Sequence, residues 1–260
     1  MEWYTKQKLK WAQFNLFNGF EIKHGFFTRH GGVSPHPWAS LNLGGTVGDT
    51  QVNISENKDR LLDAFSLSND AVYDAWQVHS ADYIRVDTPR AKDVMQAKAD
   101  ILVSNTPGIV LMMRFADCVP LWAYDPKQKA IGIAHAGWIG TTKDVAGVLV
   151  RSMTSEFGSN PKDILVGIGP SIGQEHYPVG DEVVEAVKNV INDRMNEDIE
   201  INGQPHLDLW KMNEIMLRDA GVEQIETAGI CTVCHNDDWY SHRGEKGKTG
   251  RFGAIIGIPE

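Results

Sequence analysis

The chain has 260 residues, of which 42 % are hydrophobic and 23 % charged, and its formal net charge at pH 7 is -9. These fractions are typical of a folded globular protein with enough apolar material for a sizeable core, and they exclude a largely disordered chain. The negative charge repels nucleic acids, and the sequence has no Lys/Arg cluster large enough to offset it, so DNA and RNA are not expected partners.

The sequence indicates a cytoplasmic protein with no membrane partner. Residues 1–20 mix lysines with scattered aromatic residues and have no continuous apolar stretch of the kind found in a secretion signal, and no later run reaches transmembrane length. The three cysteines, Cys118, Cys231 and Cys234, are an odd number, which favours reduced thiols in a reducing compartment.

Apolar periodicity predicts helices and strands that alternate along the chain. In chain order, we expect a helix at 52–65, strands at 72–78, 109–113 and 130–134, a helix from near Thr141 to Gly158, a strand at 164–168, helices at 183–191 and 209–217, and a strand at 253–258. In the predicted helix from Thr141 to Gly158, Thr141 and Asp144 have the spacing of a capping box, and Gly158 is a typical helix end.

This alternation predicts the α/β class. No repeat, low-complexity stretch or Pro/Gly/Ser-rich linker divides the chain, and predicted strands recur from the first third to the last residues. We therefore expect a single domain over residues 1–260, with one mixed sheet or two stacked sheets.

Three potential metal ligands follow or end predicted strands: His79 in Gln-Val-His, Cys118 in Ala-Asp-Cys, and His135 in Ala-His-Ala-Gly-Trp. One thiolate and two imidazoles suit Zn²⁺, and three protein ligands leave a fourth tetrahedral position for water or substrate. Zinc in such a site activates water or polarises a substrate oxygen. From spacing alone a second interpretation stays open, because a buried Cys often only packs and a His at a strand end often only forms hydrogen bonds.

Several further motifs occur in a fixed order. They are residues 24–34 (HGFFTRHGGVS), 41–43 (LNL), 47–49 (VGD), 56–57 (EN), 77–79 (QVH), 116–120 (ADCVP), 134–138 (AHAGW), 167–173 (GIGPSIG), 229–232 (GICT) and 249–252 (TGRF). Together they resemble the laccase-domain family, also called the purine nucleoside phosphorylase or polyphenol oxidoreductase family. The resemblance runs from about residue 20 to the C-terminus.

The resemblance implies a four-layer α/β/β/α fold with mixed sheets and a zinc site formed by His79, Cys118 and His135. It also implies phosphorolysis of adenosine, inosine and methylthioadenosine, with adenosine deamination as a second activity. The partners would then be purine nucleosides and phosphate. The sequence departs from the family pattern at two positions, since Ile139 stands where an Arg commonly follows His-Ala-Gly-Trp, and Pro178 stands where a Glu commonly follows the tyrosine.

Candidate phosphate-binding and substrate-binding residues are Arg29, Gly137 and Trp138. Gly137 precedes the predicted helix, so free backbone N–H groups and the positive end of a helix dipole are expected beside the metal, although a tight turn explains a glycine there equally well. Arg29 offers a guanidinium in a glycine-bearing loop. Trp138 is the tryptophan we expect to contact a purine, whereas Trp76 and Trp122 are expected in the core.

Other polar residues are assigned supporting roles. We expect His24 and Asp117 to orient metal ligands, as side chains next to metal-bound residues usually do. Arg243 and Arg251 are expected to support loop structure more than to contact substrate. Cys231 and Cys234 form a C-x-x-C that is followed by His235 and has no second C-x-x-C pair, so it is interpreted as packing, with a redox role as the alternative.

Three other functions are compatible with the same residues. Cys118 activated by His135 would make a metal-free cysteine hydrolase. A copper polyphenol oxidase is the function that the family's older name suggests, but the nine histidines include no His-x-His pair of the kind that multi-copper sites use. A zinc-stabilised binding protein would have the metal without turnover.

Overall fold

The computed structural model describes residues 1–91, 93–191, 200–201 and 203–260. In these residues the strands form two six-stranded mixed sheets and a short β11–β12 hairpin (Glu200–Ile201 and Gln204–Pro205). The first sheet has the order β1 (Glu2–Lys6), β2 (Leu9–Gln13), β3 (Lys23–Phe27), β14 (Phe252–Gly257), β7 (Val110–Phe115) and β4 (Val72–Asp74). The second has the order β13 (Gln224–Thr227), β10 (Leu165–Ile168), β8 (Val119–Asp125), β9 (Ala130–Ala136), β6 (Ile101–Ser104) and β5 (Tyr83–Arg85).

Most neighbouring strands within each sheet are antiparallel. In the first sheet β4 pairs in parallel with β7, and in the second sheet β5 with β6 and β13 with β10 are the parallel pairs. Each parallel pair therefore places a strand at the edge of its sheet. Both sheets are mixed, as expected from the sequence.

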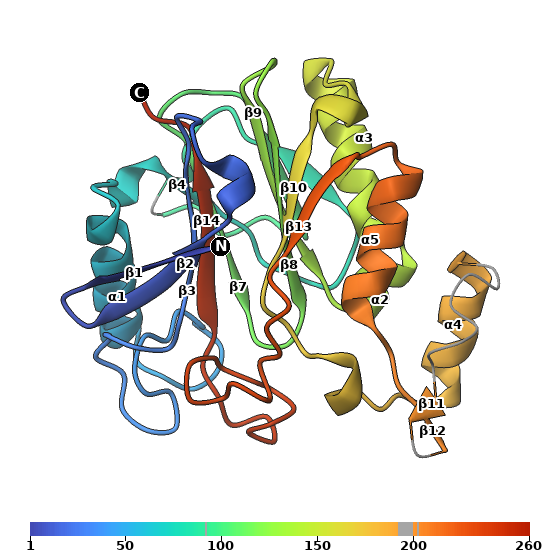
Figure 1. Ribbon diagram of the computed structural model, residues 1–260. Helices are drawn as coiled ribbons and strands as arrows, with labels where there is room; N and C mark the ends of the chain where they lie inside the picture. Colours follow the sequence, from blue (N-terminus) through green and yellow to red (C-terminus); the bar gives the residue numbers. More distant parts are fainter. Residues whose placement is uncertain (92, 192–199, 202) are drawn as a thin grey trace.

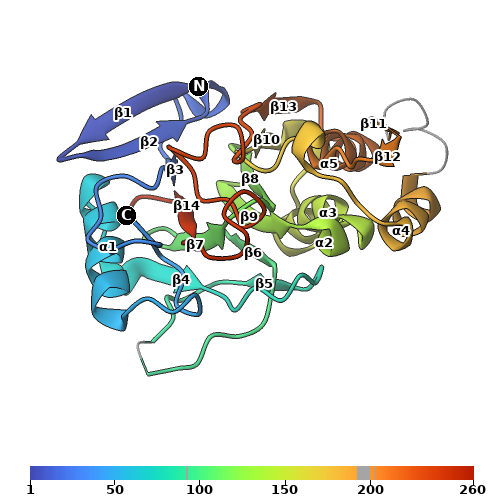
Figure 2. The ribbon, with the colours of Figure 1, turned by 90° about the horizontal axis from the view of Figure 1, so that it is seen from below.

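The two sheets stack, and helices cover their outer faces (Figures 1 and 2). Helix α1 (Gln51–Ala64) lies on the first sheet, and α3 (Val145–Phe157) and α5 (Leu209–Asp219) lie on the second, next to the short α2 (Trp138–Thr142). Helix α4 (Asp181–Ile191) lies beyond these helices. The expected four-layer α/β/β/α architecture of a single domain is thereby confirmed.

Three buried apolar clusters fill the three spaces between the layers. Leu61 and Leu62 of α1 pack with Met112 and Ile255 on one face of the first sheet. The sequence of strand β7 is mostly apolar because both of its faces are buried. Leu111 and Met113 belong to the second cluster, between the sheets, and Val110 and Met112 belong to the cluster under α1. A strand whose two faces are both covered reads as a continuous apolar run.

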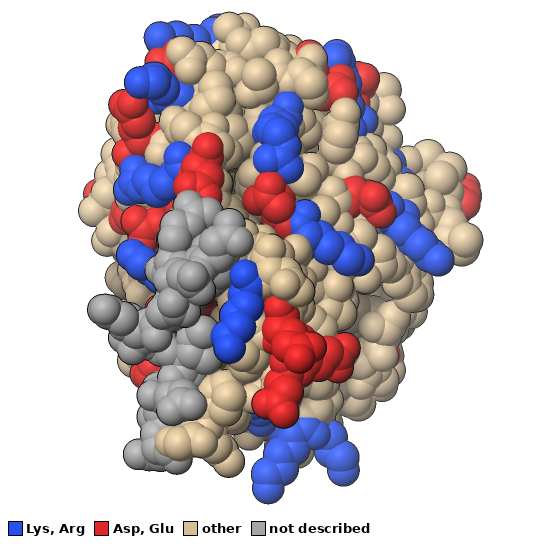
Figure 3. Space-filling model, turned by 90° about the vertical axis from the view of Figure 1, so that its right-hand side faces the viewer, with Lys and Arg blue, Asp and Glu red and all other residues tan. Residues whose placement is uncertain are grey.

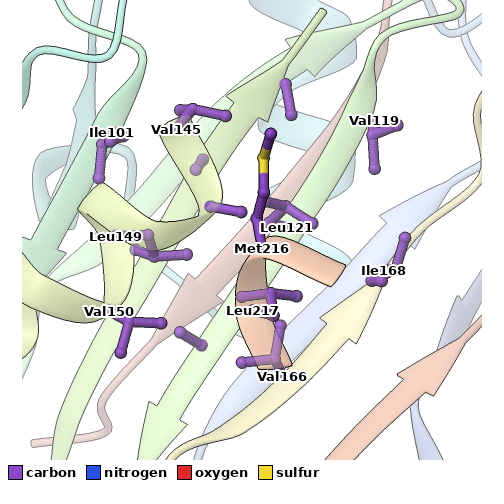
Figure 4. Close-up of a cluster of buried hydrophobic side chains, with 14 of the residues drawn as sticks. Ile101, Val119, Leu121, Val145, Leu149, Val150, Val166, Ile168, Met216 and Leu217 are labelled. Atoms are coloured by element: carbon purple, nitrogen blue, oxygen red, sulfur yellow. The ribbon is translucent and has the colours of Figure 1, made fainter. Parts of the chain in front are cut away.

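The third cluster lies between the second sheet and its helices. Leu149 and Val150 of α3 meet Leu121, Val166 and residues of α5 there (Figure 4). Each of these side chains is fully buried or nearly so, and burial of a Leu, Ile or Val side chain contributes about 1.5–3 kcal/mol. The layers are therefore held together mainly by apolar burial.

Two predicted elements differ from the structure. The predicted strand 72–78 ends at Asp74, because the chain then leaves the sheet and the N–H groups of Val78 and His79 donate to the Asp100 carboxylate. The helix predicted to begin near Thr141 is two helices. Thr141 lies inside α2, and Asp144 caps α3 in a left-handed conformation (φ 60°) with its side chain accepting from the Gly147 N–H.

The outer surface agrees with the charge pattern of the sequence. Figure 3 shows the face formed by α3, α4 and α5. Among the described residues of this face, Lys and Arg side chains are interspersed with Asp and Glu and form no extended basic surface. Within the described residues, no helix combines the length and apolarity needed to cross a bilayer.

Candidate metal centre

The fold brings His79, Cys118 and His135 together. They lie at the end of the two sheets where the chain crosses from β7 to β8, and this connection is at the lower end in Figure 1. His79 follows β4 of the first sheet, His135 lies in β9 of the second sheet, and Cys118 ends the segment that crosses from β7 to β8. The register places Pro120 opposite His135, so Cys118 lies beside the end of β9. We call these three residues the cleft cluster.

The geometry of the cleft cluster fits a zinc ion. The candidate ligand atoms all lie within 4.8 Å of one another, and Cys118 Sγ is 3.9 Å from His79 Nε2. Tetrahedral zinc with ordinary bond lengths separates a sulfur and a nitrogen ligand by about 3.6 Å. Small side-chain rotations therefore suffice, and three ligands would leave a fourth position facing the cleft.

Asp100, just before β6, holds both histidines in place. Its Oδ1 accepts from His135 Nδ1–H at 2.8 Å, which directs the Nε2 of that imidazole toward Cys118. The same fully buried carboxylate accepts from the N–H groups of Val78, His79 and Ser80, which shapes the turn that carries His79 (φ 59°). Asp100 is therefore the main positioning residue of the centre, and nothing in the sequence pattern pointed to it.

Asp117 precedes Cys118 and supports the main chain there, whereas we expected it to orient a metal ligand directly. It is in a left-handed conformation (φ 83°), its Oδ1 accepts from the Thr232 hydroxyl at 2.6 Å, and its Oδ2 accepts from the Arg243 N–H at 2.6 Å. These bonds fasten the segment that carries Cys118 to the loop before β14.

Charge interactions within the centre favour the Cys118 thiolate. Burial alone would raise the pKa of this thiol, but the charge and hydrogen bond of His135 and those of His79 outweigh it and lower the pKa to about 6. Burial also disfavours the imidazolium of His135, whereas the Cys118 thiolate and the Asp100 carboxylate together raise its pKa. The thiolate is the form that binds metals and attacks electrophiles.

Gly137 stands where any side chain would obstruct the centre. A Cβ at this position would lie 2.9 Å from Cys118 Sγ and 3.0 Å from His79 Cδ2. Gly137 is also the N-cap of α2, which has only five residues. A helix start beside the candidate metal centre is thus present, but close approach to Cys118 and His79 is a sufficient reason for the glycine.

A cleft of about 1400 Å³ opens in front of the cleft cluster. Its lining includes the predicted residues Gly137 and Trp138, together with Ile139 and Tyr177. Trp76 also lines the cleft and is 47 % exposed, whereas Trp122 is fully buried and donates from Nε1 to the Ile255 carbonyl. The core assignment is therefore right for Trp122 and wrong for Trp76.

The cleft carries positive charge although the protein is acidic overall. Five basic residues line it, against three carboxylates (Asp59, Asp74 and Asp117); the basic residues are Lys58, Arg90, Arg114, Arg243 and Arg251. Arg90 and Arg114 are paired with the buried Asp74. Arg243 and Arg251 line the cleft and also donate hydrogen bonds to carbonyls of nearby loops. Arg243 donates to the Pro178 carbonyl at 3.2 Å, and Arg251 uses Nη1 for the Thr249 and Gly250 carbonyls.

Two predicted residues lie elsewhere. Among the described residues, Arg29 is not part of the cleft lining; its guanidinium donates to the carbonyls of Ala39 and Asn236, pairs with Glu245 and lies over Tyr240. The structure thus gives Arg29 a role in fastening loops.

His24 does not orient a metal ligand, contrary to expectation. It is buried in the core between Phe14 and Phe17, and its Nε2 accepts from the Phe14 N–H at 2.9 Å. Burial lowers its pKa to about 4, so the ring is neutral near pH 7.

A family model described as multi-copper polyphenol oxidoreductase laccase matches residues 23–259. The chain belongs to this family. The purine nucleoside phosphorylase YlmD of Bacillus subtilis (strain 168) is 37 % identical over 262 residues, which cover 96 % of this chain and 93 % of that protein. The purine nucleoside phosphorylase YfiH of Escherichia coli (strain K12) is 35 % identical over 229 residues, 88 % of this chain and 90 % of that protein.

Solved structures of the laccase family have the same fold. The crystal structure of YlmD from Geobacillus stearothermophilus superposes with a TM-score of 0.91 at 33 % identity, and the match covers 99 % of this chain and 98 % of that one. The resemblance read from the ordered motifs is thereby confirmed.

Proposed function

We propose that this member of the laccase family is a zinc-dependent purine nucleoside phosphorylase. Its substrates would be adenosine, inosine and methylthioadenosine, with adenosine deamination as a second activity of the same site. The observation that carries the proposal is the cleft cluster itself, a three-ligand set at the wall of a cleft with cationic side chains. Relatives that align over most of their length bear the name purine nucleoside phosphorylase.

Phosphorolysis exchanges one bond at the anomeric carbon of the ribose. A phosphate oxygen forms a bond to this carbon, the bond to the purine nitrogen breaks, and a proton passes to that nitrogen. The products are the free purine and ribose 1-phosphate, or the 5-methylthio derivative of this sugar phosphate when methylthioadenosine is the substrate. Deamination adds water at the six-position of adenosine and releases ammonia, giving inosine. When bound, zinc would supply a Lewis acid that stabilises developing negative charge or activates water.

The residues of the chain have separate tasks in this reaction. Arg251 and Arg243 are the proposed phosphate-binding side chains, since both line the cleft and no described residue accepts a hydrogen bond from Nε or Nη2 of Arg251. Trp138 and Tyr177 offer aromatic surface for the purine. The main chain at Gly137 leaves the approach to the centre open. Ile139 at the cleft provides no charge where the family commonly has an Arg.

We further propose that the whole chain, residues 1–260, works as one domain in the cytoplasm on small molecules. Three free thiols support a reducing compartment. Strand β14, near the C-terminus, pairs with the N-terminal strand β3 in one sheet, which supports a single domain.

The test is product analysis with a metal assay on the same sample. Purified protein of known zinc and copper content is incubated with adenosine, with and without phosphate, beside the His79→Ala variant. We expect phosphate-dependent adenine release, or inosine formation, that is lost in the variant together with the zinc. His79 is exposed, so its replacement should leave the core intact. Folded, zinc-containing protein without any product would refute the proposal.

A cysteine hydrolase is the second candidate, and one observation favours it. Asp100, His135 and Cys118 form a chain of carboxylate, imidazole and thiol, the arrangement that activates a nucleophile. Alkylation separates the two functions. A hydrolase would lose activity on reaction with iodoacetamide while containing no metal, whereas bound zinc should protect Cys118 from the reagent.

A copper polyphenol oxidase is the function that the name of the family model suggests. The copper assay on the same sample decides this point. Protein that contains copper and oxidises phenols, with no phosphorolysis, would support the oxidase.

A further inference from the structure

A second group of thiols and an imidazole lies outside the cleft cluster. Cys231 and Cys234 come from the loop that follows β13, and His176 ends the 3-10 helix Gln174–His176, which lies at the same end of the molecule (Figure 1). Their candidate ligand atoms all lie within 4.8 Å of one another. We call these three residues the surface cluster, because the group reaches the surface at Cys234, which is exposed. His176 is half-buried and Cys231 is buried.

The distances in the surface cluster match those around a tetrahedral ion. His176 Nδ1 is 3.7 Å from Cys231 Sγ and 3.5 Å from Cys234 Sγ. Zinc would place its sulfur and nitrogen ligands about 3.6 Å apart. Two of the donors come from a C-x-x-C turn, the spacing with which structural zinc sites bind two ligands from one loop.

A fourth donor is near. Glu175 Oε1 lies 3.9 Å from Cys234 Sγ, and the Gly173 N–H donates to Cys231 Sγ at 3.2 Å. Backbone N–H groups that point at sulfur stabilise a thiolate, and a carboxylate is an acceptable zinc ligand. The environment is therefore built for more than packing, which was our interpretation of these cysteines from the sequence.

We propose that Cys231, Cys234 and His176 bind a second zinc ion. The Glu175 carboxylate contacts Cys234 but lies outside the set of atoms within 4.8 Å of one another, so it would become the fourth ligand by a rotation of its side chain. Four protein ligands fill the tetrahedron, so this site is structural and not catalytic. It does not depend on the proposed nucleoside activity, because it concerns metal content and fold alone.

The surface cluster connects segments that also form the cleft. Tyr177 follows His176, and the Arg243 guanidinium lies over its ring at 5.1 Å. Thr232 follows Cys231 and donates to Asp117, the residue before Cys118. An ion in the surface cluster would therefore fasten the 3-10 helix to the loop that supports Asp117 and Arg243.

The first experiment is the zinc content of single variants, measured by mass spectrometry of elements after gel filtration. We expect two zinc ions per wild-type chain, one in Cys118→Ser, one in Cys234→Ser, and none in the double variant. His235→Ala is the matched control, because His235 is an exposed histidine next to Cys234 that is not part of the cluster. This control should keep both ions.

A second measurement starts from protein whose surface cluster is intact. In Cys118→Ser protein loaded with Co²⁺ in place of zinc, the proposed site should give the intense visible absorption and thiolate-to-metal charge transfer of a tetrahedral ion with sulfur ligands. Adding His176→Asn to this protein should abolish both signals.

Two results would overturn the proposal. One is a Cys234→Ser protein with the same zinc content as wild type. The other is wild-type protein purified under reducing conditions whose intact mass is lower by two hydrogens and whose only zinc is lost in Cys118→Ser, since that result assigns the two thiols to a disulfide. If Cys234→Ser does not fold, the Co²⁺ spectrum of Cys118→Ser decides alone.

Discussion

The cleft cluster and the surface cluster offer the same kinds of donor, thiol sulfur and imidazole nitrogen, and differ in where the nearest carboxylate lies. Behind the cleft cluster, Asp100 binds the far nitrogen of the His135 ring. Beside the surface cluster, Glu175 lies next to the sulfur of Cys234. A carboxylate behind an imidazole orients the ligand and leaves the fourth position free, whereas a carboxylate beside the ligands fills it.

The burial of the supporting carboxylate also bears on the difference between the two clusters. The carboxylate of Asp100 is fully buried and accepts several backbone and side-chain hydrogen bonds, so the cleft cluster is rigidly positioned before any ion binds. The cleft in front of it admits a substrate. Similar donors can therefore serve turnover in one place and stability in another, and the supporting groups decide which.

The largest expected effect comes from removing the carboxylate that distinguishes the two clusters. Asp100→Ala leaves His135 and three backbone N–H groups without their acceptor, and loss of one partner of a buried charged pair costs about 3–5 kcal/mol. Loss of such a supporting group also weakens metal binding about 10- to 100-fold. Urea denaturation and zinc competition with a chelator measure both quantities.

Asp82→Ala is the control, since Asp82 is an exposed carboxylate in the same turn. If Asp100→Ala bound zinc as tightly as this control, the positioning role of Asp100 would be refuted.

The pH dependence of stability sharpens the same point. Burial tends to raise the pKa of Asp100, but the hydrogen bonds from His135 and Ser80 and the charge of His135 lower it from 3.8 to about 2. A lowered folded-state pKa means that the ionised carboxylate contributes its full stability above the unfolded value and loses it as the pH falls toward about 2. In metal-free protein, the stability deficit of Asp100→Asn should therefore shrink across this interval. A deficit that stayed constant there would contradict the assignment.

Gly137→Ala tests the steric side of the cleft cluster. The added methyl group would press on Cys118 and His79, and overpacking of this kind costs about 1–3 kcal/mol. We expect lower zinc content and lower activity, measured together with the midpoint of unfolding. Gly180→Ala is the matched control, because a Cβ there has no neighbour within 4 Å. Equal behaviour of the two variants would show that the approach at Gly137 is not limiting.

Arg251→Ala tests the charge of the cleft and depends on the proposed activity. Loss of a guanidinium that binds phosphate should raise the KM for phosphate about tenfold, or about 1.4 kcal/mol, with zinc content unchanged. Arg29→Ala should lower stability, because Glu245 loses its ion pair and two carbonyls lose their donor, and should leave this KM as it is. The reverse pattern would move the phosphate site to Arg29.

The smallest effect is expected at Ile139, where the cleft lacks the family's usual cation. Ile139→Arg adds a half-exposed positive charge to the cleft, and such a charge contributes about 0.5–1 kcal/mol to anion binding. The KM for phosphate should fall about threefold, whereas Ile139→Leu should not change it. Initial rates at several phosphate concentrations detect the difference, and a higher KM in Ile139→Arg would argue against an anion near this residue.

Burial made several strands predictable from their apolar runs, but the fully buried strands β6 and β8 were not among the predicted elements. Strands β7, β9, β10 and β14 are covered on both faces, and their apolar runs located them to within about two residues. Strand β1 was missed because all five of its residues are exposed, so it has no apolar signal. Strand β4 was predicted too long, since Trp76 and Val78 are apolar but lie at the cleft and the surface.

The sequence predicted which residues meet at the candidate site, but not how they are arranged. His79, Cys118 and His135 carry chemistry in their side chains and lie next to strand ends, which the sequence shows. Asp100 becomes important only through contacts with residues that are distant in the chain. Arg29 and Arg251 occur in equally glycine-rich segments, so only the fold distinguishes the arginine that fastens loops from the one that lines the cleft.

The crossing of residues 116–118 from one sheet to the other has a consequence for cooperativity. The ligands of the cleft cluster belong to both sheets, so an ion held there would be a cross-link between layers that otherwise touch through apolar side chains. Opening of the edge strand β4 would then require release of the ion. Amide hydrogen exchange in β4 and in the turn that follows it should slow when the metal is bound, and the two sheets should exchange as one unit.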